Sequence, residues 1–114
     1  MSDGYELYTE LRGKLSYLSA CIDRLRERGK DYGAAERDYK MALSKRILQL
    51  RDQKIPVTII SDICRGEADI ARLRFKRDVA EVQYKAAQEV INSTKLEIRI
   101  IENQIGREYG ASSR

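Results

Sequence analysis

Two long segments with helical periodicity flank the only proline of this chain, Pro56. Proline lacks an amide proton and clashes with the preceding helical turn, so a single helix cannot run straight through it. The residue before proline is also pushed toward extended backbone geometry. We therefore predict a long helix over 5–53, a tip over 54–66, a second long helix over 67–109 and a disordered tail over 110–114. The fold class is all-α: a long antiparallel helical hairpin, or coiled coil, with a short helical tip.

The tip should be a small helical structure of its own. Proline suits the first turn of a helix, and Gly66 is placed to end the tip helix with a positive φ. Glu67 and Asp69 then fall in the first turn of the next helix, where carboxylates are favourable. One side of the tip is apolar: Val57, Ile59, Ile60, Ile63 and Cys64. We expect a hydrophobic plug, with a helix-turn-helix or a partner-docking tip as the alternatives.

The first long segment carries one apolar stripe with alternating steps of three and four residues, which is typical of a helix. Its members are Leu7, Leu11, Leu15, Leu18, Ile22, Leu25, Gly29, Tyr32, Tyr39, Leu43, Ile47 and Leu50. Gly29 and Gly33 are its weak point, since glycine in a helix interior costs about 1 kcal/mol relative to alanine. Because the stripe stays in phase across them, we expect an unbroken helix with a large neighbour near Gly29, and a bend is the alternative.

The second long segment has a heptad repeat over about five heptads, the pattern of a coiled-coil seam. Its members are Ile70, Leu73, Arg77, Ala80, Tyr84, Ala87, Ile91, Thr94, Ile98, Ile101 and Ile105. A second apolar stripe beside it supplies the predicted partner or dimer face: Val79, Val82, Ala86, Val90 and Ile100. A two-helix hairpin buries only one seam, so the extra stripe predicts another buried surface. The simplest partner is a second copy of the chain, which would give a homodimeric four-helix bundle.

Folding the chain about residue 60 predicts the register of the two arms. Leu50 would then lie near Ile70, and Gly29 near Ile91. The segments 35–42 and 80–87 share an Ala-Glu-Tyr-Lys-Ala pattern at one level of this hairpin. Tyr39 and Tyr84 would therefore lie against alanines of the opposite arm, a large-against-small fit. Coincidence in two helices rich in Ala, Glu and Lys is the alternative.

Composition limits the chemistry of the chain. Its 114 residues predict a single domain over 1–114, and 35% charged with 7% aromatic residues suits long exposed helices. There is no histidine, and Cys21 and Cys64 are the only cysteines, too few for a structural zinc site. We therefore predict no catalytic, metal-binding or cofactor-binding residues and no enzymatic activity. The absence of a long apolar run or a leader predicts a cytoplasmic protein without membrane association.

Positive charge gathers around the tip. The segment 40–77 holds ten Lys and Arg against four Asp and Glu, a net +6 in a chain of net charge +4. A basic cluster of this kind is what phosphate binding requires. The residues predicted to bind nucleic acid or an acidic partner are Arg51, Lys54, Arg65, Arg72, Arg74 and Arg77. Phe75 is the only nearby candidate for stacking on a base. A solvated helix face is the alternative to both roles.

Four stretches carry a resemblance to known proteins: 39–51, YKMALSKRILQLR; 56–66, PVTIISDICRG; 77–85, RDVAEVQYK; and 95–102, KLEIRIIE. With them, the chain from about residue 30 resembles a family of small uncharacterised helical proteins from phages and prophages of Gram-positive bacteria. The resemblance implies a phage early gene product, often encoded among replication and recombination functions. That family has no established activity, so the resemblance assigns no residue a role.

These observations predict a non-enzymatic, dimeric coiled-coil protein of phage or prophage origin that acts through protein–protein interaction. Its partner would be a host or phage protein. The alternative is a nucleic-acid-binding accessory protein of phage replication or recombination that uses the basic tip. A salt titration separates the two, because binding to phosphates weakens steeply as salt rises.

Overall fold

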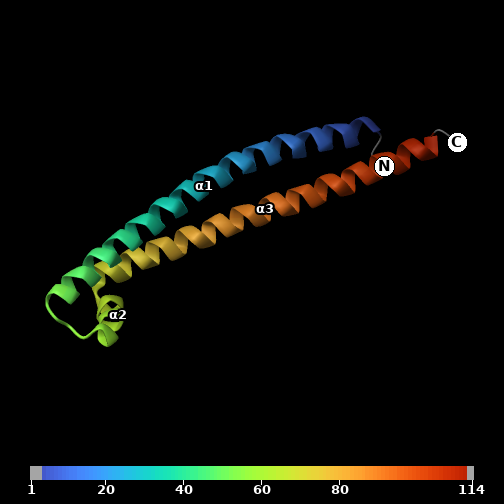
Figure 1. Ribbon diagram of the computed structural model, residues 1–114. Helices are drawn as coiled ribbons and strands as arrows, with labels where there is room; N and C mark the ends of the chain where they lie inside the picture. Colours follow the sequence, from blue (N-terminus) through green and yellow to red (C-terminus); the bar gives the residue numbers. More distant parts are fainter. Residues whose placement is uncertain (1–3, 113–114) are drawn as a thin grey trace. The chain divides into compact units, whose positions relative to one another are not determined.

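The structure, a computed structural model, describes residues 4–112, with side chains described for residues 4–110. This part of the chain is all-helical and contains no strand (Figure 1). The helices are α1 (Gly4–Asp52), α2 (Val57–Gly66) and α3 (Ala68–Ser112). The all-α class and the break at Pro56 are confirmed. The prediction of a disordered tail over 110–114 is wrong for residues 110–112, which continue α3. Residues 113 and 114 lie outside the described part.

The chain forms two compact units. One, here called the end unit, consists of Met1–Arg26 and Lys85–Arg114, and the other, the tip unit, is Glu27–Tyr84. Both long helices run through both units, so each unit contains a piece of α1 and a piece of α3 that lie side by side. The tip unit also contains α2 (Figure 1). The prediction of one domain over 1–114 stays a prediction.

The end unit buries the predicted seam of α3. Ile91, Thr94, Ile98 and Ile101 are all buried, as is Leu7 on α1. The hydroxyl of Thr94 donates a hydrogen bond of 2.7 Å to the carbonyl oxygen of Val90, which satisfies a buried polar group within its own helix.

The predicted stripe of α1 fails at one position in the end unit. Leu15 is exposed, whereas the neighbouring Lys14 is half-buried and forms an ion pair with Glu97 of α3. A lysine can bury its aliphatic stem while it keeps its ammonium group in contact with a carboxylate. This pair takes the interhelical position that the sequence pattern assigned to Leu15.

A small hydrophobic cluster closes the tip unit. Leu50 of α1 packs with Ile60 and Cys64 of α2, and all three are buried. Partly buried apolar residues surround them: Leu43, Ile47, Ile55 and Ile63. The predicted hydrophobic plug is therefore present. Val57 and Ile59, which were expected to belong to it, are exposed instead, because the buried face of α2 is defined by Ile60 and Cys64, one helical turn apart.

The turn after α1 is a Schellman motif. The amide of Ile55 donates to the carbonyl oxygen of Leu50 at 3.1 Å, and the amide of Lys54 donates to that of Arg51 at 2.9 Å. Lys54 adopts the left-handed conformation that this motif requires, with a φ of 60°. The chain therefore leaves the helix at Lys54, before Pro56.

The predicted positive φ at Gly66 is wrong. No described glycine has a positive φ, and α2 runs through Gly66 as its last residue. The chain turns instead at Glu67, whose backbone is extended with a φ of −79° and a ψ of 133°. The carbonyl oxygen of Glu67 then accepts a hydrogen bond from the amide of Ala71, so α3 begins directly after it, with Asp69 in its first turn.

α1 is unbroken through Gly29 and Gly33, as expected. The large neighbour at Gly29 is Tyr84, however, and not Ile91. A Cβ atom at Gly29 would lie 3.4 Å from Cε2 of Tyr84, and the rings of Tyr32 and Tyr84 are 5.9 Å apart at their centroids. The pairing at this level therefore differs from the predicted register by one heptad.

Tyr39 and Tyr84, the tyrosines of the shared pattern, have different neighbours, and their predicted packing against alanines stays a prediction. Tyr39 carries the guanidinium of Arg77 over its ring, 4.7 Å from the centroid, a cation–π geometry. Tyr84 instead contacts Tyr32 and Gly29. The shared pattern in segments 35–42 and 80–87 therefore does not give the two tyrosines equivalent surroundings.

Candidate functional site

The six predicted cationic site residues all lie in the tip unit, on α1, the following turn, α2 and α3. Arg51, Lys54, Arg65 and Arg72 are exposed, and Arg74 and Arg77 are half-buried. The side chains of five of the six, all except Arg77, make no hydrogen bond or ion pair with any residue that the structure describes. Their charges are therefore available to a ligand.

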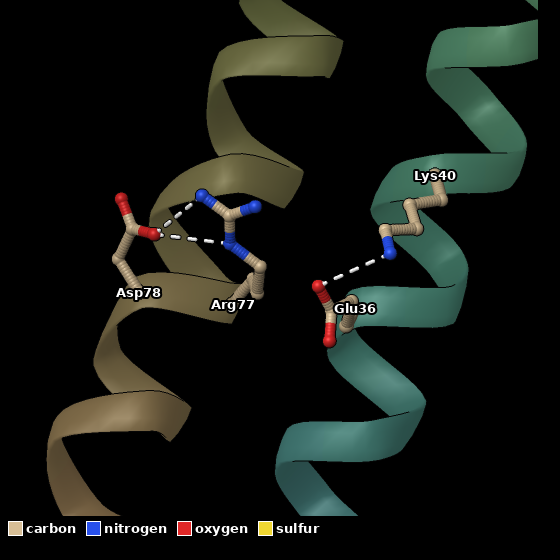
Figure 2. A network of polar contacts seen from close by, with 4 residues as sticks. All are labelled: Glu36, Lys40, Arg77 and Asp78. Atoms are coloured by element: carbon tan, nitrogen blue, oxygen red, sulfur yellow. Dashed lines mark hydrogen bonds and ion pairs between the residues drawn. The ribbon is translucent and has the colours of Figure 1, made fainter.

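Arg77 is already engaged. Its guanidinium donates hydrogen bonds to Asp78 at 2.8 and 3.1 Å and lies over the ring of Tyr39. Figure 2 shows this pair on α3 beside a second pair on α1, in which Lys40 reaches Glu36 at 3.4 Å. The hydrogen bonds to Asp78 also raise the pKa of Arg77. Arg77 is thus the one predicted phosphate contact whose charge is offset locally.

An interhelical ion pair fixes the start of α3 to α1. Nε of Arg46 donates to both carboxylate oxygens of Glu67, at 2.8 and 2.9 Å. These hydrogen bonds raise the pKa of Arg46. Glu67 was predicted only to favour the N-terminal end of α3, but its side chain reaches across to the other long helix. Within the tip unit, this ion pair neutralises one positive charge and one negative charge.

Cations exceed carboxylates in what remains around the tip. Between residues 40 and 77, the cations without an ion pair to a described residue are Lys45, Arg51, Lys54, Arg65, Arg72, Arg74 and Lys76. The corresponding carboxylates are Asp52, Asp62 and Asp69. Charge repulsion among exposed cations is relieved when a polyanion or an acidic surface binds. The structure thus leaves most of the predicted positive charge unneutralised.

Exposed apolar side chains accompany these cations in the tip unit. Val57 and Ile59 are exposed on α2, and Phe75, Val79 and Val82 are exposed on α3. Steps of four and three residues place the last three on one face of α3. Val79 and Val82 belong to the predicted partner face, while Phe75 was considered only as a stacking residue.

The rest of the predicted partner face lies in the end unit. There Ala86, Val90 and Ile100 are exposed, and Leu96 is exposed as well. The second stripe of α3 is thus solvent-facing in each unit, while the first stripe forms the contact with α1.

Sequence reasoning missed a small cavity in the tip unit. It has a volume of about 110 Å³, and its polar lining consists of Tyr39, Ser61, Arg65 and Arg74. These residues come from all three helices of the tip unit. Arg65 and Arg74 were predicted as surface contacts, whereas Tyr39 was assigned to the core stripe and Ser61 was given no role. No spacing in the sequence links the four, because α2 brings Ser61 and Arg65 to this cavity.

Other chemistry finds little support in the described part of the chain. Cys21 and Cys64 are both free and buried. Residues 4–112 hold no group of three or more Cys, Asp or Glu side chains arranged to bind a metal ion. Within the same range, no helix has the length and apolar character needed to span a membrane. No family model, curated protein or solved structure matches this chain.

Proposed function

We propose that this chain is a non-enzymatic binding protein that acts by contacting another protein through the exposed apolar side chains of its tip unit. The observation that carries the proposal is the stripe of Phe75, Val79 and Val82, with Phe75 70% exposed. Single exposed apolar residues are ordinary on protein surfaces. Three on one helix face, at coiled-coil spacing and turned away from the intramolecular seam, form a surface that favours a helical partner.

A second copy of the chain is the simplest such partner. In a homodimer the same stripe of each copy would meet, and apolar surface would leave water on both sides. The resemblance to phage and prophage proteins suggests a further partner, a phage or host protein. The unpaired cations beside Val57 and Ile59 would favour an acidic surface on that protein.

Sedimentation velocity of the full chain over about two decades of concentration tests the homodimer. We expect a reversible dimer whose dissociation constant rises at least about tenfold in the double variant F75S/V82S, because apolar contact area is lost. The matched control is Leu48→Ser, which changes an exposed apolar residue of α1 and should leave the dissociation constant unchanged. A chain that stays monomeric throughout, and that captures no protein from a host extract, contradicts the proposal.

Nucleic acid is the second candidate, and the five unpaired cations of the predicted site favour it. If all five contact phosphates of duplex DNA, the logarithm of the binding constant should fall with the logarithm of salt concentration with a slope of about −4.5. Fluorescence anisotropy with duplex and single-stranded DNA measures this slope. The charge reversals Arg51→Glu and Arg72→Glu should weaken binding, whereas Arg12→Glu in the end unit should matter less. Absence of binding at low salt removes this candidate.

A further inference from the structure

We propose that the cavity between Arg65 of α2 and Arg74 of α3 binds a single terminal phosphate group. This site goes beyond protein binding through the apolar stripe, because it uses different residues and a different chemistry. Two arginines and two residues that carry a hydroxyl group, Tyr39 and Ser61, line the same small cavity. Guanidinium groups bind phosphate oxygens through paired, charge-assisted hydrogen bonds.

The charge state of the cavity points to an anion. The side chains of Arg65 and Arg74 make no hydrogen bond or ion pair with any residue in the described range, and no Asp or Glu lines the cavity. Arg74 is also half-buried, and none of the residues that line the cavity offers it a carboxylate as a counter-ion. A cation in that position is stabilised by an anion that enters beside it. Arg72, by contrast, is exposed and does not line this cavity.

The size of the cavity limits which anions can bind in it. Its volume of about 110 Å³ corresponds to roughly four water molecules, which is enough for a phosphate group and too little for a nucleoside. Ligand pockets for larger molecules usually exceed about 300 Å³. A terminal phosphate could therefore enter while the rest of its molecule stays outside. A phosphodiester of a nucleic-acid backbone would have to bring a substituent on each side into the same space.

The surrounding residues add neutral donors and an apolar wall. The hydroxyl groups of Ser61 and Tyr39 can each donate a hydrogen bond to a phosphate oxygen. The guanidinium of Arg77 lies 4.7 Å from the centre of the Tyr39 ring, although Asp78 offsets its charge. Leu43, Ile70 and Ala71 supply the apolar part of the wall, which limits access of water and strengthens the charged contacts.

Titration of the full-length chain with inorganic phosphate, at constant ionic strength set by chloride, tests the proposal. We expect saturable binding by calorimetry, with the largest amide NMR shifts at Ser61, Arg65 and Arg74. The variants Arg65→Gln and Arg74→Gln should each weaken binding at least about tenfold, the usual effect of losing a charge-assisted hydrogen bond. Arg12→Gln, which changes an exposed arginine of the end unit, is the matched control and should bind phosphate as the unchanged chain does.

Two further measurements identify the class of ligand and show whether the variants still fold. Phenyl phosphate, a monoester, should compete with inorganic phosphate, whereas dimethyl phosphate, a diester, should not. Arg65 is exposed, so Arg65→Gln should retain the circular dichroism spectrum of the unchanged chain even if Arg74→Gln does not. Equal phosphate binding by the Arg65→Gln and Arg12→Gln variants, or shifts spread evenly over the basic residues, would overturn the site. Equal competition by the diester would overturn the preference for a terminal phosphate.

Discussion

At the scale of single residues, Gly29 and Gly33 differ in what surrounds them. A methyl group at Gly33 would meet nothing within 4 Å, whereas one at Gly29 would meet the Tyr84 ring at 3.4 Å. Because alanine favours the helix, we expect Gly33→Ala to raise the free energy of unfolding by about 1 kcal/mol. Gly29→Ala should give a smaller gain, since it crowds Tyr84. Urea unfolding followed by circular dichroism measures the stability of both variants. A loss of stability in Gly33→Ala would contradict a helix that is unbroken at this position.

Lys14 gives the end unit a pH dependence in the alkaline range. Its hydrogen bond and charge interaction with Glu97 raise the pKa of Lys14 above its ordinary value of 10.5. A pKa raised by folding means that the pair stabilises the native state fully below about pH 10.5 and that this contribution is lost as the pH rises through the higher folded value. We expect Lys14→Met to be less stable than the unchanged chain at pH 8, with the difference shrinking above pH 10.5.

The control for Lys14 is Lys30→Met, which removes an exposed lysine that has no ion pair with a described residue. Because this variant breaks no ion pair, it should be about as stable as the unchanged chain at pH 8. Thermal unfolding at several pH values compares the three proteins. A difference between Lys14→Met and the unchanged chain that grows with pH would contradict the assignment.

At the scale of elements, α2 is held to α1 by a few buried side chains. Leu50 is 3% exposed and packs on Ile60 and Cys64, whereas Leu48, two residues earlier on the same helix, is 60% exposed. We expect Leu50→Ala to lower the free energy of unfolding by about 2–5 kcal/mol, through lost burial and a cavity. Leu48→Ala should change it by less than about 0.5 kcal/mol. Similar losses in the two variants, measured by urea unfolding, would mean that α2 does not pack on Leu50.

The Schellman turn makes a prediction at Lys54. A non-glycine residue at a φ of 60° is disfavoured by about 1–2 kcal/mol relative to the right-handed conformation, and glycine avoids most of this cost. Lys54→Gly should therefore raise the free energy of unfolding by roughly 0.5–1 kcal/mol. The comparison is Lys45→Gly, which lies inside α1 and should be destabilising by about 1 kcal/mol. Destabilisation by Lys54→Gly would contradict the left-handed turn.

Element boundaries could be predicted because local chemistry decides them. Pro56 and the two apolar stripes set the three helices to within a few residues. The conformation of the turns could not be predicted from residue type alone, since Lys54 takes the left-handed position that glycine would favour, and Gly66 stays helical. At Lys54 the two hydrogen bonds of the turn and the packing of Ile55 on the Leu50 cluster outweigh the local preference.

At the scale of the whole molecule, the register could not be read from the stripes. A heptad seam slides by seven residues and still places apolar residues opposite apolar residues. Irregular contacts select one register: Gly29 with Tyr84, Arg46 with Glu67 and, in the end unit, Lys14 with Glu97. The candidate site, too, could be predicted only in part from the sequence. Its cations were visible in composition, but the engagement of Arg77 and the cavity near Ser61 depend on three-dimensional packing.

Nuclear Overhauser effects at the Tyr84 ring test the central claim, the antiparallel pairing of α1 and α3 in the tip unit, most directly. The structure predicts cross-peaks from the ring protons of Tyr84 to the α protons of Gly29 and to the ring of Tyr32, since these groups are in contact. Mixing labelled and unlabelled chains shows whether these cross-peaks arise within one chain, as we predict. Cross-peaks from Gly29 to Ile91 instead, with none to Tyr84, would contradict the account.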